Sequence, residues 1–163
     1  MTSVITIGFS RPKHKLLPVG SWLIRLYQGT SYSHVYLKFY SKSLDRVLIY
    51  EAVGGGVRFV SQQVWNSKAE EVVQVSLNIS DANYKTLLQY CVDHAGVKYG
   101  VLQNVGVVIS ELLKLKHNLF TSGVNCSEIV AQILQLEGYT FSKNLNLVTP
   151  KDIELTLSNS PGV

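Results

Sequence analysis

The sequence predicts one α+β domain over residues 1–163, with an antiparallel sheet packed by helices. The length of 163 residues suits a single domain with one hydrophobic core. Most of the first half alternates between apolar and polar residues in short stretches, as strands do, whereas the second half has apolar residues at helical spacing. Strands followed by helices in this way are typical of an α+β fold rather than of alternating β–α units.

Alternating apolar residues predict the strands. The clearest stretch is 33–40 (SHVYLKFY), in which Val35, Leu37 and Phe39 face one side of the strand and His34 faces the other. Comparable stretches predict further strands at 4–9, 46–53, 57–61 and 71–77. The glycines at 54–56 predict the turn between the second and third of these further strands.

Apolar spacing and end signals predict five helices. They cover 18–29, 80–96, about 101–117, a stretch that begins near Cys126, and 149–157. In the first helix, Trp22, Leu23 and Leu26 are expected to form the apolar face. In the last helix, Thr149 is the expected N-cap and Pro150 the first helical residue.

Composition and charge narrow the classes of function. A net charge of +4 is only mildly basic, and the clusters Arg11–Lys15 and Lys114–Lys116 are expected to be solvated surface, so no nucleic-acid partner is predicted. Two cysteines do not make a disulfide framework. No secretory signal is recognisable, and the apolar run 101–110 is far shorter than the ~20 residues of a membrane-spanning helix. The default expectation is a cytoplasmic protein, with delivery in a virion or to a host as alternatives.

Cys126 is the first candidate site residue. It lies in the first turn of a predicted helix, where unpaired N–H groups and the helix dipole stabilise a thiolate. It could therefore be a nucleophile, a metal ligand or a buried core residue. Cys91 lies on the apolar stripe of its own helix and is predicted to be core. Because the sequence has no CxxC, HxxxH or clustered acidic loop, neither a metal nor another cofactor is predicted.

His34 and Glu51 are candidate partners for that cysteine. His34 lies within a strand, where a half-exposed histidine without a catalytic role is the simplest alternative. Glu51 lies in an otherwise apolar stretch, where an unpaired charge is costly. If residues 41–44 form the hairpin loop, Tyr40 faces Asp45 and His34 faces Glu51. This register places an imidazole beside a carboxylate, the arrangement that orients a general base.

Five short motifs in this order resemble the circularly permuted branch of the NlpC-type, papain-like thiol hydrolases. The branch includes YiiX-like hydrolases and lecithin:retinol acyltransferase-like proteins. The motifs are SYSHVYL at 31–37, IYEAVGGGV at 49–57, KYG at 98–100, NCSEIVAQIL at 125–134 and LVTPKDIELTL at 147–157. Two features depart from the family pattern: NCSE replaces the usual DCSG, and the segment between Tyr99 and Cys126 is long and apolar.

The resemblance implies a papain-like fold, with the histidine before the cysteine in the chain, and a cysteine peptidase or amidase activity. Carried over by motif, Cys126 is the nucleophile, His34 the base and Glu51 the orienting acid. Tyr99 and Asn125 are expected to shape the oxyanion and substrate region, with a packing role as the alternative for Tyr99. The expected substrate is an amide bond in a cell-wall (peptidoglycan) peptide or a similar peptide, and no cofactor is required.

Two other functions stay open. The same fold in a lipid-directed acyltransferase or phospholipase would act on an acyl ester, and the apolar segment 101–120 with the basic KLKHN could then meet a membrane. A core helix is the preferred interpretation of that segment. The third possibility is a non-catalytic structural or binding protein that keeps a vestigial site. A peripheral contact with a membrane or cell wall is therefore left open, as is the oligomeric state.

Overall fold

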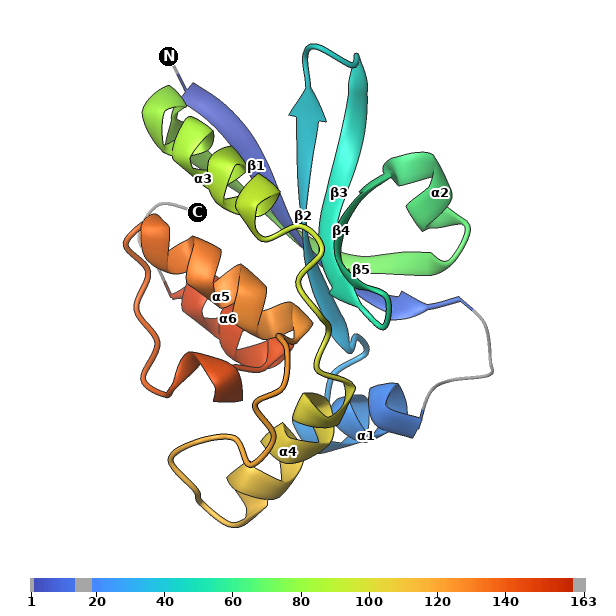
Figure 1. Ribbon diagram of the computed structural model, residues 1–163, viewed down its shortest axis with the longest axis vertical. Helices are drawn as coiled ribbons and strands as arrows, with labels where there is room; N and C mark the ends of the chain where they lie inside the picture. The colour runs from blue at the N-terminus through green and yellow to red at the C-terminus, as the bar shows by residue number, and fades with distance from the viewer. Residues whose placement is uncertain (1, 14–18, 160–163) are drawn as a thin grey trace.

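The computed structural model describes residues 2–13 and 19–159, and in this part of the chain it shows a mixed α+β fold (Figure 1). A five-stranded antiparallel sheet stands in the middle. Helices α3, α5 and α6 pack on one face, α2 covers part of the other face, and α1 and α4 lie together beyond one end of the sheet. The predicted fold class and the predicted antiparallel sheet are confirmed.

The strand order is β4-β3-β2-β1-β5. Their bounds are β1 Thr2–Pro12, β2 His34–Ser41, β3 Arg46–Val53, β4 Gly56–Ser61 and β5 Ala69–Ser80. Each predicted strand is present, and β1 and β5 extend beyond the predicted ranges at both ends. Glycine at position 8 is required in β1, because a Cβ there would lie 2.2 Å from the ring of Tyr36 on the neighbouring strand.

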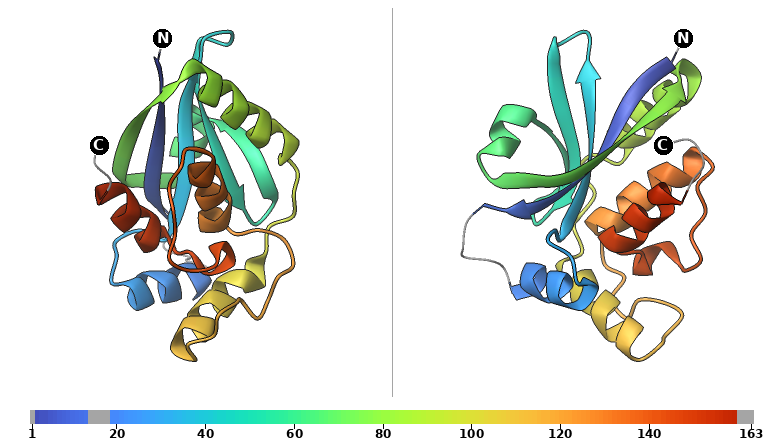
Figure 2. Two further views of the ribbon diagram at one scale, coloured as in Figure 1. Left: turned by 90° about the vertical axis from the view of Figure 1, so that its left-hand side faces the viewer. Right: turned by 180° about the vertical axis from the view of Figure 1, so that it is seen from behind.

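The sheet opens between β1 and β2 at one end. Their pairing runs from Ser10 opposite His34 to Thr6 opposite Lys38, and beyond it β1 pairs only with β5 and β2 only with β3 (Figure 2). A cavity of about 1050 Å³ lies at this opening, lined by Phe39, Phe59 and Tyr84 among others. Because His34 is at the opposite end of β2, this cavity is separate from the candidate site.

The helices follow the predicted pattern with three differences. Their bounds are α1 Val19–Gln28, α2 Gln62–Asn66, α3 Asp81–Asp93, α4 Val101–Leu112, α5 Cys126–Leu136 and α6 Pro150–Ser158, with a short 3₁₀ helix η1 at Leu145–Leu147. Helix α2 was not predicted, because five residues are too short for a clear apolar period. Helix α4 ends at Leu112, five residues before the predicted end, since Lys114 takes a left-handed conformation with φ of 54°. Helix α3 likewise ends at Asp93, before the predicted end at Gly96.

The helix that was predicted at 18–29 presents a different face from the expected one. Trp22 and Leu26 are 51% and 64% exposed, whereas Ile24 is buried. The side chain of Leu23, the third residue of the expected face, lies outside the described part of the structure. The basic cluster predicted around Arg11–Lys15 lies partly outside the described residues.

The main core lies between the sheet and helices α3, α5 and α6. Apolar side chains of β1 and β2 meet Leu87 of α3, Ile129 and Ile133 of α5, and Ile153 of α6. A smaller cluster on the other face joins Tyr36, Ile49 and Trp65, and α2 supplies the tryptophan. In the described residues, no helix is long and apolar enough to cross a membrane.

Candidate active site

Three elements bring the candidate residues together. His34 is the first residue of β2, Glu51 lies in the neighbouring strand β3, and Cys126 is the first residue of α5. The helix α5 packs against β2 through its buried apolar face, which places its N-terminus next to the start of that strand. The fold therefore joins three residues that are far apart in the sequence.

His34 and Glu51 are hydrogen-bonded, with Nε2 of the imidazole 3.1 Å from Oε2 of the carboxylate. The register that predicted this contact was wrong by two residues. Tyr40 pairs with Val47 instead of Asp45, and continuing this ladder places Glu51 opposite Tyr36. Because a shift of two residues keeps every side chain on its face, His34 and Glu51 remain diagonal neighbours on one side of the sheet, within reach of long side chains.

Glu51 has two further partners that the sequence analysis missed. Arg58 donates from Nη2 to Oε1 at 2.7 Å, and the indole N–H of Trp65 donates to Oε2 at 3.1 Å. The carboxylate is only 3% exposed, and burial alone would raise its pKa, but the charges and hydrogen bonds of His34 and Arg58 lower it to about 2. The contact with Arg58 could have been predicted from the glycines at 54 and 55, because a two-residue turn there pairs Glu51 with Arg58.

Cys126 interacts with the same histidine that binds Glu51. Cys126 is 3% exposed, and burial alone would raise the pKa of its thiol. The charge and hydrogen bond of His34, together with the backbone N–H groups of Val35 and Ser127, lower it instead. Since Nε2 of His34 is bound to Glu51, Nδ1 is the ring nitrogen available to the sulfur.

The pKa of His34 shifts upward, in the opposite direction to the pKa of Cys126. Burial alone would lower the pKa of His34, but the thiolate of Cys126 and the carboxylate of Glu51 outweigh it and raise the pKa to about 10. The thiol thus loses its proton at a lower pH than the imidazolium does. When the two groups hold one proton between them, the favoured arrangement is therefore a thiolate–imidazolium pair, in which the sulfur is a nucleophile.

Tyr99 lies close to this pair. It joins Val124 in an isolated bridge beside the N-terminus of α5, and its hydroxyl oxygen accepts a hydrogen bond of 2.7 Å from Nδ2 of Asn104. Burial raises the pKa of Tyr99, and the negative charge of Cys126 raises it further. The phenol therefore keeps its proton and has it available to donate. Asn104 was not predicted, and no sequence motif marks it.

Asn125 is the N-cap of α5. Its Oδ1 accepts from the backbone N–H of Glu128 at 2.8 Å and from the hydroxyl of Ser127 at 2.9 Å. The residue is fully buried, and its Nδ2 has no hydrogen-bond partner among the described residues. The side-chain oxygen of Asn125 thus caps the N-terminus of α5, where Cys126 lies. Only the side-chain nitrogen is free for the predicted oxyanion or substrate role.

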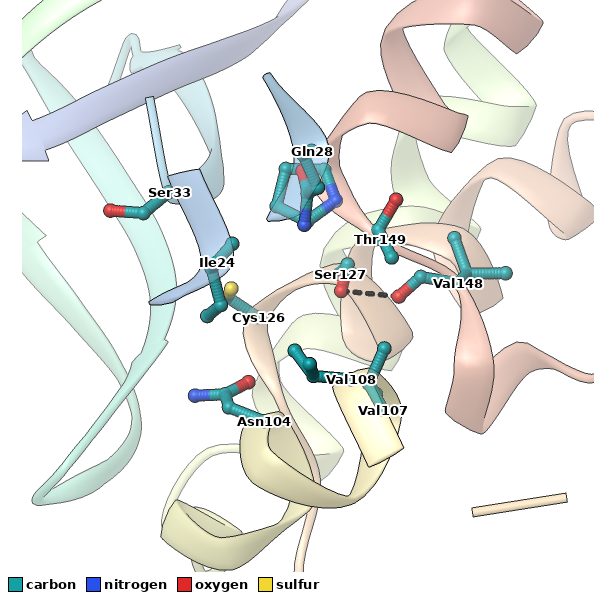
Figure 3. A pocket seen from close by; sticks show the side chains of 11 residues that line it. Ile24, Gln28, Ser33, Asn104, Val107, Val108, Cys126, Ser127, Val148 and Thr149 are labelled. Atoms are coloured by element: carbon teal, nitrogen blue, oxygen red, sulfur yellow. Dashed lines mark hydrogen bonds between the residues drawn. The ribbon is translucent and has the colours of Figure 1, made fainter. Parts of the chain in front are cut away.

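The cavity beside Cys126 is narrow. It is lined by Ile24 and Gln28 of α1, by Asn104, Val107 and Val108 of α4, and by residues 148–150 before and at the start of α6 (Figure 3). Its volume is about 10 Å³, which is room for roughly one water molecule. Among the described residues, this cavity is too small to hold a substrate, and the segments that line it would have to move to admit one.

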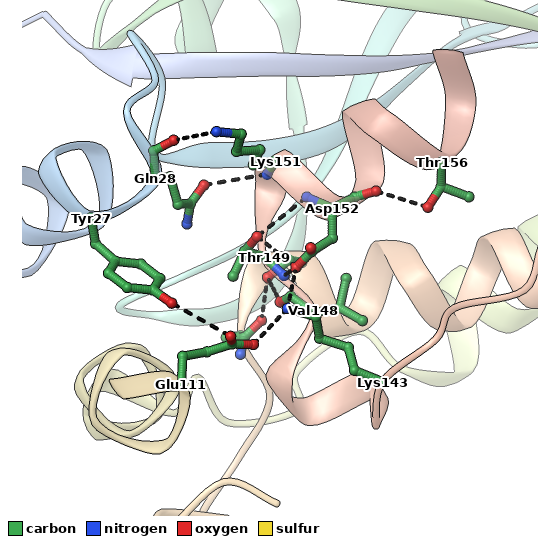
Figure 4. A network of polar contacts seen from close by, with 11 residues as sticks. Tyr27, Gln28, Glu111, Lys143, Val148, Thr149, Lys151, Asp152 and Thr156 are labelled. Atoms are coloured by element: carbon green, nitrogen blue, oxygen red, sulfur yellow. Dashed lines mark hydrogen bonds and ion pairs between the residues drawn. The ribbon is translucent and has the colours of Figure 1, made fainter. Parts of the chain in front are cut away.

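Polar contacts tie α1 and α4 to the start of α6 (Figure 4). Lys143 bridges Glu111 of α4 and Asp152 of α6, and Glu111 also accepts a long hydrogen bond of 3.4 Å from Tyr27 of α1. Lys151 donates from Nζ to the backbone carbonyl of Gln28 at 2.8 Å. These contacts join the two helices that line the cavity to the segment 143–152.

Cys91 is fully buried in the main core, as predicted. Burial raises its pKa to about 12, so the thiol stays protonated at neutral pH. Within residues 2–13 and 19–159, no group of three or more histidine, cysteine, aspartate or glutamate side chains could hold a metal ion.

Comparison of the chain with protein-family models, with curated proteins and with solved structures gives no match.

The pKa shifts predict a pH profile for Cys126. We expect the midpoint of its ultraviolet thiolate absorbance to lie below pH 9, the ordinary pKa of a thiol, because His34 stabilises the charged sulfur. The measurement is an absorbance titration of the wild type minus that of Cys126→Ala. His34→Asn should return the midpoint to pH 9 or above, since burial without the imidazolium raises the pKa. Cys91 does not interfere, because its pKa is about 12. An unchanged midpoint in His34→Asn would contradict the ion pair.

Proposed function

We propose that the protein is a cysteine-dependent hydrolase that cleaves an amide bond by thiol acyl transfer. One observation carries the proposal: Cys126, at the start of α5, interacts with His34, and His34 is hydrogen-bonded to the buried carboxylate of Glu51. Nucleophile, base and orienting acid in hydrogen-bond contact form the arrangement that activates a weak nucleophile in many unrelated hydrolases. The resemblance of the motifs to permuted NlpC-type enzymes supports the same roles and a papain-like topology with the histidine before the cysteine.

Acylation follows from the resting ion pair. The thiolate of Cys126 attacks the carbonyl carbon, and the carbonyl oxygen becomes an oxyanion. The imidazolium of His34 then gives its proton to the amide nitrogen, the C–N bond breaks, and the amine leaves a thioester on the sulfur. Glu51 keeps the imidazole oriented throughout, while Arg58 and Trp65 hold the carboxylate in place.

Deacylation restores the resting state. Neutral His34 takes a proton from water, the hydroxide attacks the thioester carbonyl, and the thiolate leaves as the carboxylic product forms. Tyr99 is the side chain that we propose as a donor to the oxyanion, because its oxygen accepts from Asn104 and its proton stays free. The Nδ2 atom of Asn125 and the backbone N–H of Cys126 are further proposed donors.

The proposed substrate is a peptide or isopeptide bond, with a cell-wall peptide as the first choice because the motifs resemble hydrolases of that kind. A cytoplasmic setting, with delivery in a virion or to a host as alternatives, remains part of the proposal. No cofactor enters any step.

A lipid-directed acyltransferase or phospholipase is the second candidate. One observation favours it: the helices that close the cavity over Cys126 expose apolar side chains, including Trp22 and Leu26 of α1 and Leu112 of α4. Helix α4 is therefore only partly the core helix that the sequence analysis preferred. The thiol attacks an ester carbonyl in the same way as an amide carbonyl. The three candidate catalytic residues therefore do not distinguish these two substrates.

The test is to trap the acyl-enzyme. The protein is incubated separately with a cell-wall muropeptide, a phosphatidylcholine dispersion and an activated aryl acetate, quenched in acid, and analysed by peptide mass spectrometry. We expect an acyl adduct on Cys126 and none on Cys91. Acylation by the muropeptide or by the lipid identifies the substrate class, whereas acylation by the aryl acetate shows only that Cys126 is nucleophilic. If none of them does so, the non-catalytic alternative with a vestigial site is favoured.

A further inference from the structure

Helices α1 and α4 expose large apolar side chains beside the cavity. On α4, Val101, Val105 and Leu112 share one stripe of the helix with the cavity-lining Val108, so the exposed stripe runs along the edge of the cavity. We call the following residues the α1–α4 apolar face: Trp22, Leu26, Val101, Val105, Leu112 and Leu113. Large apolar side chains grouped on adjacent elements, rather than scattered, indicate an interaction surface.

The exposure of these side chains is high. Leu112 and Leu113 are 67% and 63% exposed, at the point where α4 ends. The chain then turns back, and Asn118 fastens the returning segment by donating to the backbone carbonyls of Gln103 and Asn146. Glycine at 106 permits this close approach, because a Cβ there would lie 2.0 Å from Oδ1 of Asn118. The leucines are thus held outward by a fixed turn.

The charges beside this face are positive. Lys114 and Lys116 are exposed directly after the two leucines, and Arg25 lies on α1. From 98 to 125 the only carboxylate is that of Glu111, which is paired with Lys143. An apolar face with a cationic border and no unpaired carboxylate complements an anionic lipid surface, into which the leucines insert while the lysines meet the headgroups.

We propose that the α1–α4 apolar face, with Lys114 and Lys116, docks this protein on an anionic lipid bilayer. The docking is independent of the bond that the enzyme cleaves, and it does not require the proposed chemistry. Figure 1 shows α1 and α4 side by side at one end of the molecule, beyond the end of the sheet.

The first experiment is vesicle co-sedimentation, with vesicles of phosphatidylcholine alone and of phosphatidylcholine mixed with phosphatidylglycerol. We expect stronger binding to the mixed vesicles and a decrease with added salt. Lys114→Gln with Lys116→Gln should weaken binding to the mixed vesicles by roughly tenfold to thirtyfold, at about 1 kcal/mol for each lysine. Leu112→Ser with Leu113→Ser should weaken it by about tenfold or more.

Matched controls change the same residue types elsewhere. Leu44→Ser with Leu155→Ser removes two leucines that are 56% and 49% exposed on the β2–β3 turn and on α6. Lys42→Gln with Lys85→Gln removes two exposed lysines near the other cavity. These four substitutions should leave binding unchanged, and circular dichroism checks that every variant is folded.

Tryptophan fluorescence locates the contact. The chain has two tryptophans: Trp22 lies on the face, and Trp65 is buried beside Glu51. Mixed vesicles should shift the emission to shorter wavelength, and Trp22→Phe should abolish that shift. Absence of binding to both vesicle types would overturn the proposal. So would a solution dimer that Leu112→Ser with Leu113→Ser converts to a monomer, since a second copy would then cover the face.

Discussion

Cys126→Ala is expected to abolish turnover, on whichever substrate the wild type cleaves, because no other group can form the thioester. The substitution removes the sulfur that accepts from the backbone N–H groups of Val35 and Ser127 and pairs with His34. A steady-state assay of purified protein measures the loss, and mass spectrometry should show no acyl adduct. The protein should remain folded, since the other buried residues of α5 are unchanged.

Cys91→Ala is the matched control for this experiment. Cys91 lies in the core of the same domain and has a raised pKa, so it is not a nucleophile at neutral pH. Its replacement should leave turnover intact and lower the free energy of unfolding by about 1 kcal/mol through lost packing. Residual turnover in Cys126→Ala at the wild-type level would show that the reaction occurs elsewhere.

Glu51→Gln is expected to lower turnover by roughly one to four orders of magnitude. The amide keeps the shape of the side chain but loses the charge that orients His34 and stabilises its protonated form. Because the carboxylate is buried and bound by Arg58 and Trp65 as well, some loss of stability should accompany the loss of activity. Circular dichroism and a steady-state assay at a temperature where the variant is folded separate the two effects.

The pH dependence of stability gives Glu51→Gln a second readout. The pKa of Glu51 falls from its ordinary value of 4.5 to about 2 on folding. This group therefore stabilises the fold fully above about pH 4.5, and the contribution disappears as the pH falls toward 2. Glu51→Gln should lack this part of the acid-dependent loss, as measured by denaturant unfolding at several pH values.

Glu71→Gln is the control for a carboxylate of the same sheet. Glu71 accepts hydrogen bonds from Tyr36 and Lys38 without contacting His34, so its replacement should leave turnover unchanged. If Glu51→Gln also leaves turnover unchanged, the site is a Cys–His pair and another group must orient the imidazole.

Local signals in the sequence determined where helices start and which strand side chains lie on the same face of the sheet. The side chains of Asn125 and Thr149 cap α5 and α6 because a short polar side chain before an apolar period satisfies the first free N–H groups. Alternation along β2 and β3 placed His34 and Glu51 on one face, and an error of two residues in register did not change this parity. These features depend only on near neighbours in the chain.

Other features depended on contacts between distant segments. Which side of α1 is buried could not be predicted from its composition, because Trp22 and Leu26 are as apolar as the buried Ile24 and only the position of α4 decides between them. The path of the chain after α4 likewise depends on distant segments, because Asn118 returns to Gln103 and Asn146. The distance between Cys126 and His34 depends on how α5 packs against β2, and the closed cavity depends on α1 and α4 meeting above the sulfur. Sequence periodicity identifies which side chains share a face, whereas the burial and partners of a charged group are set by segments that are far apart in the chain.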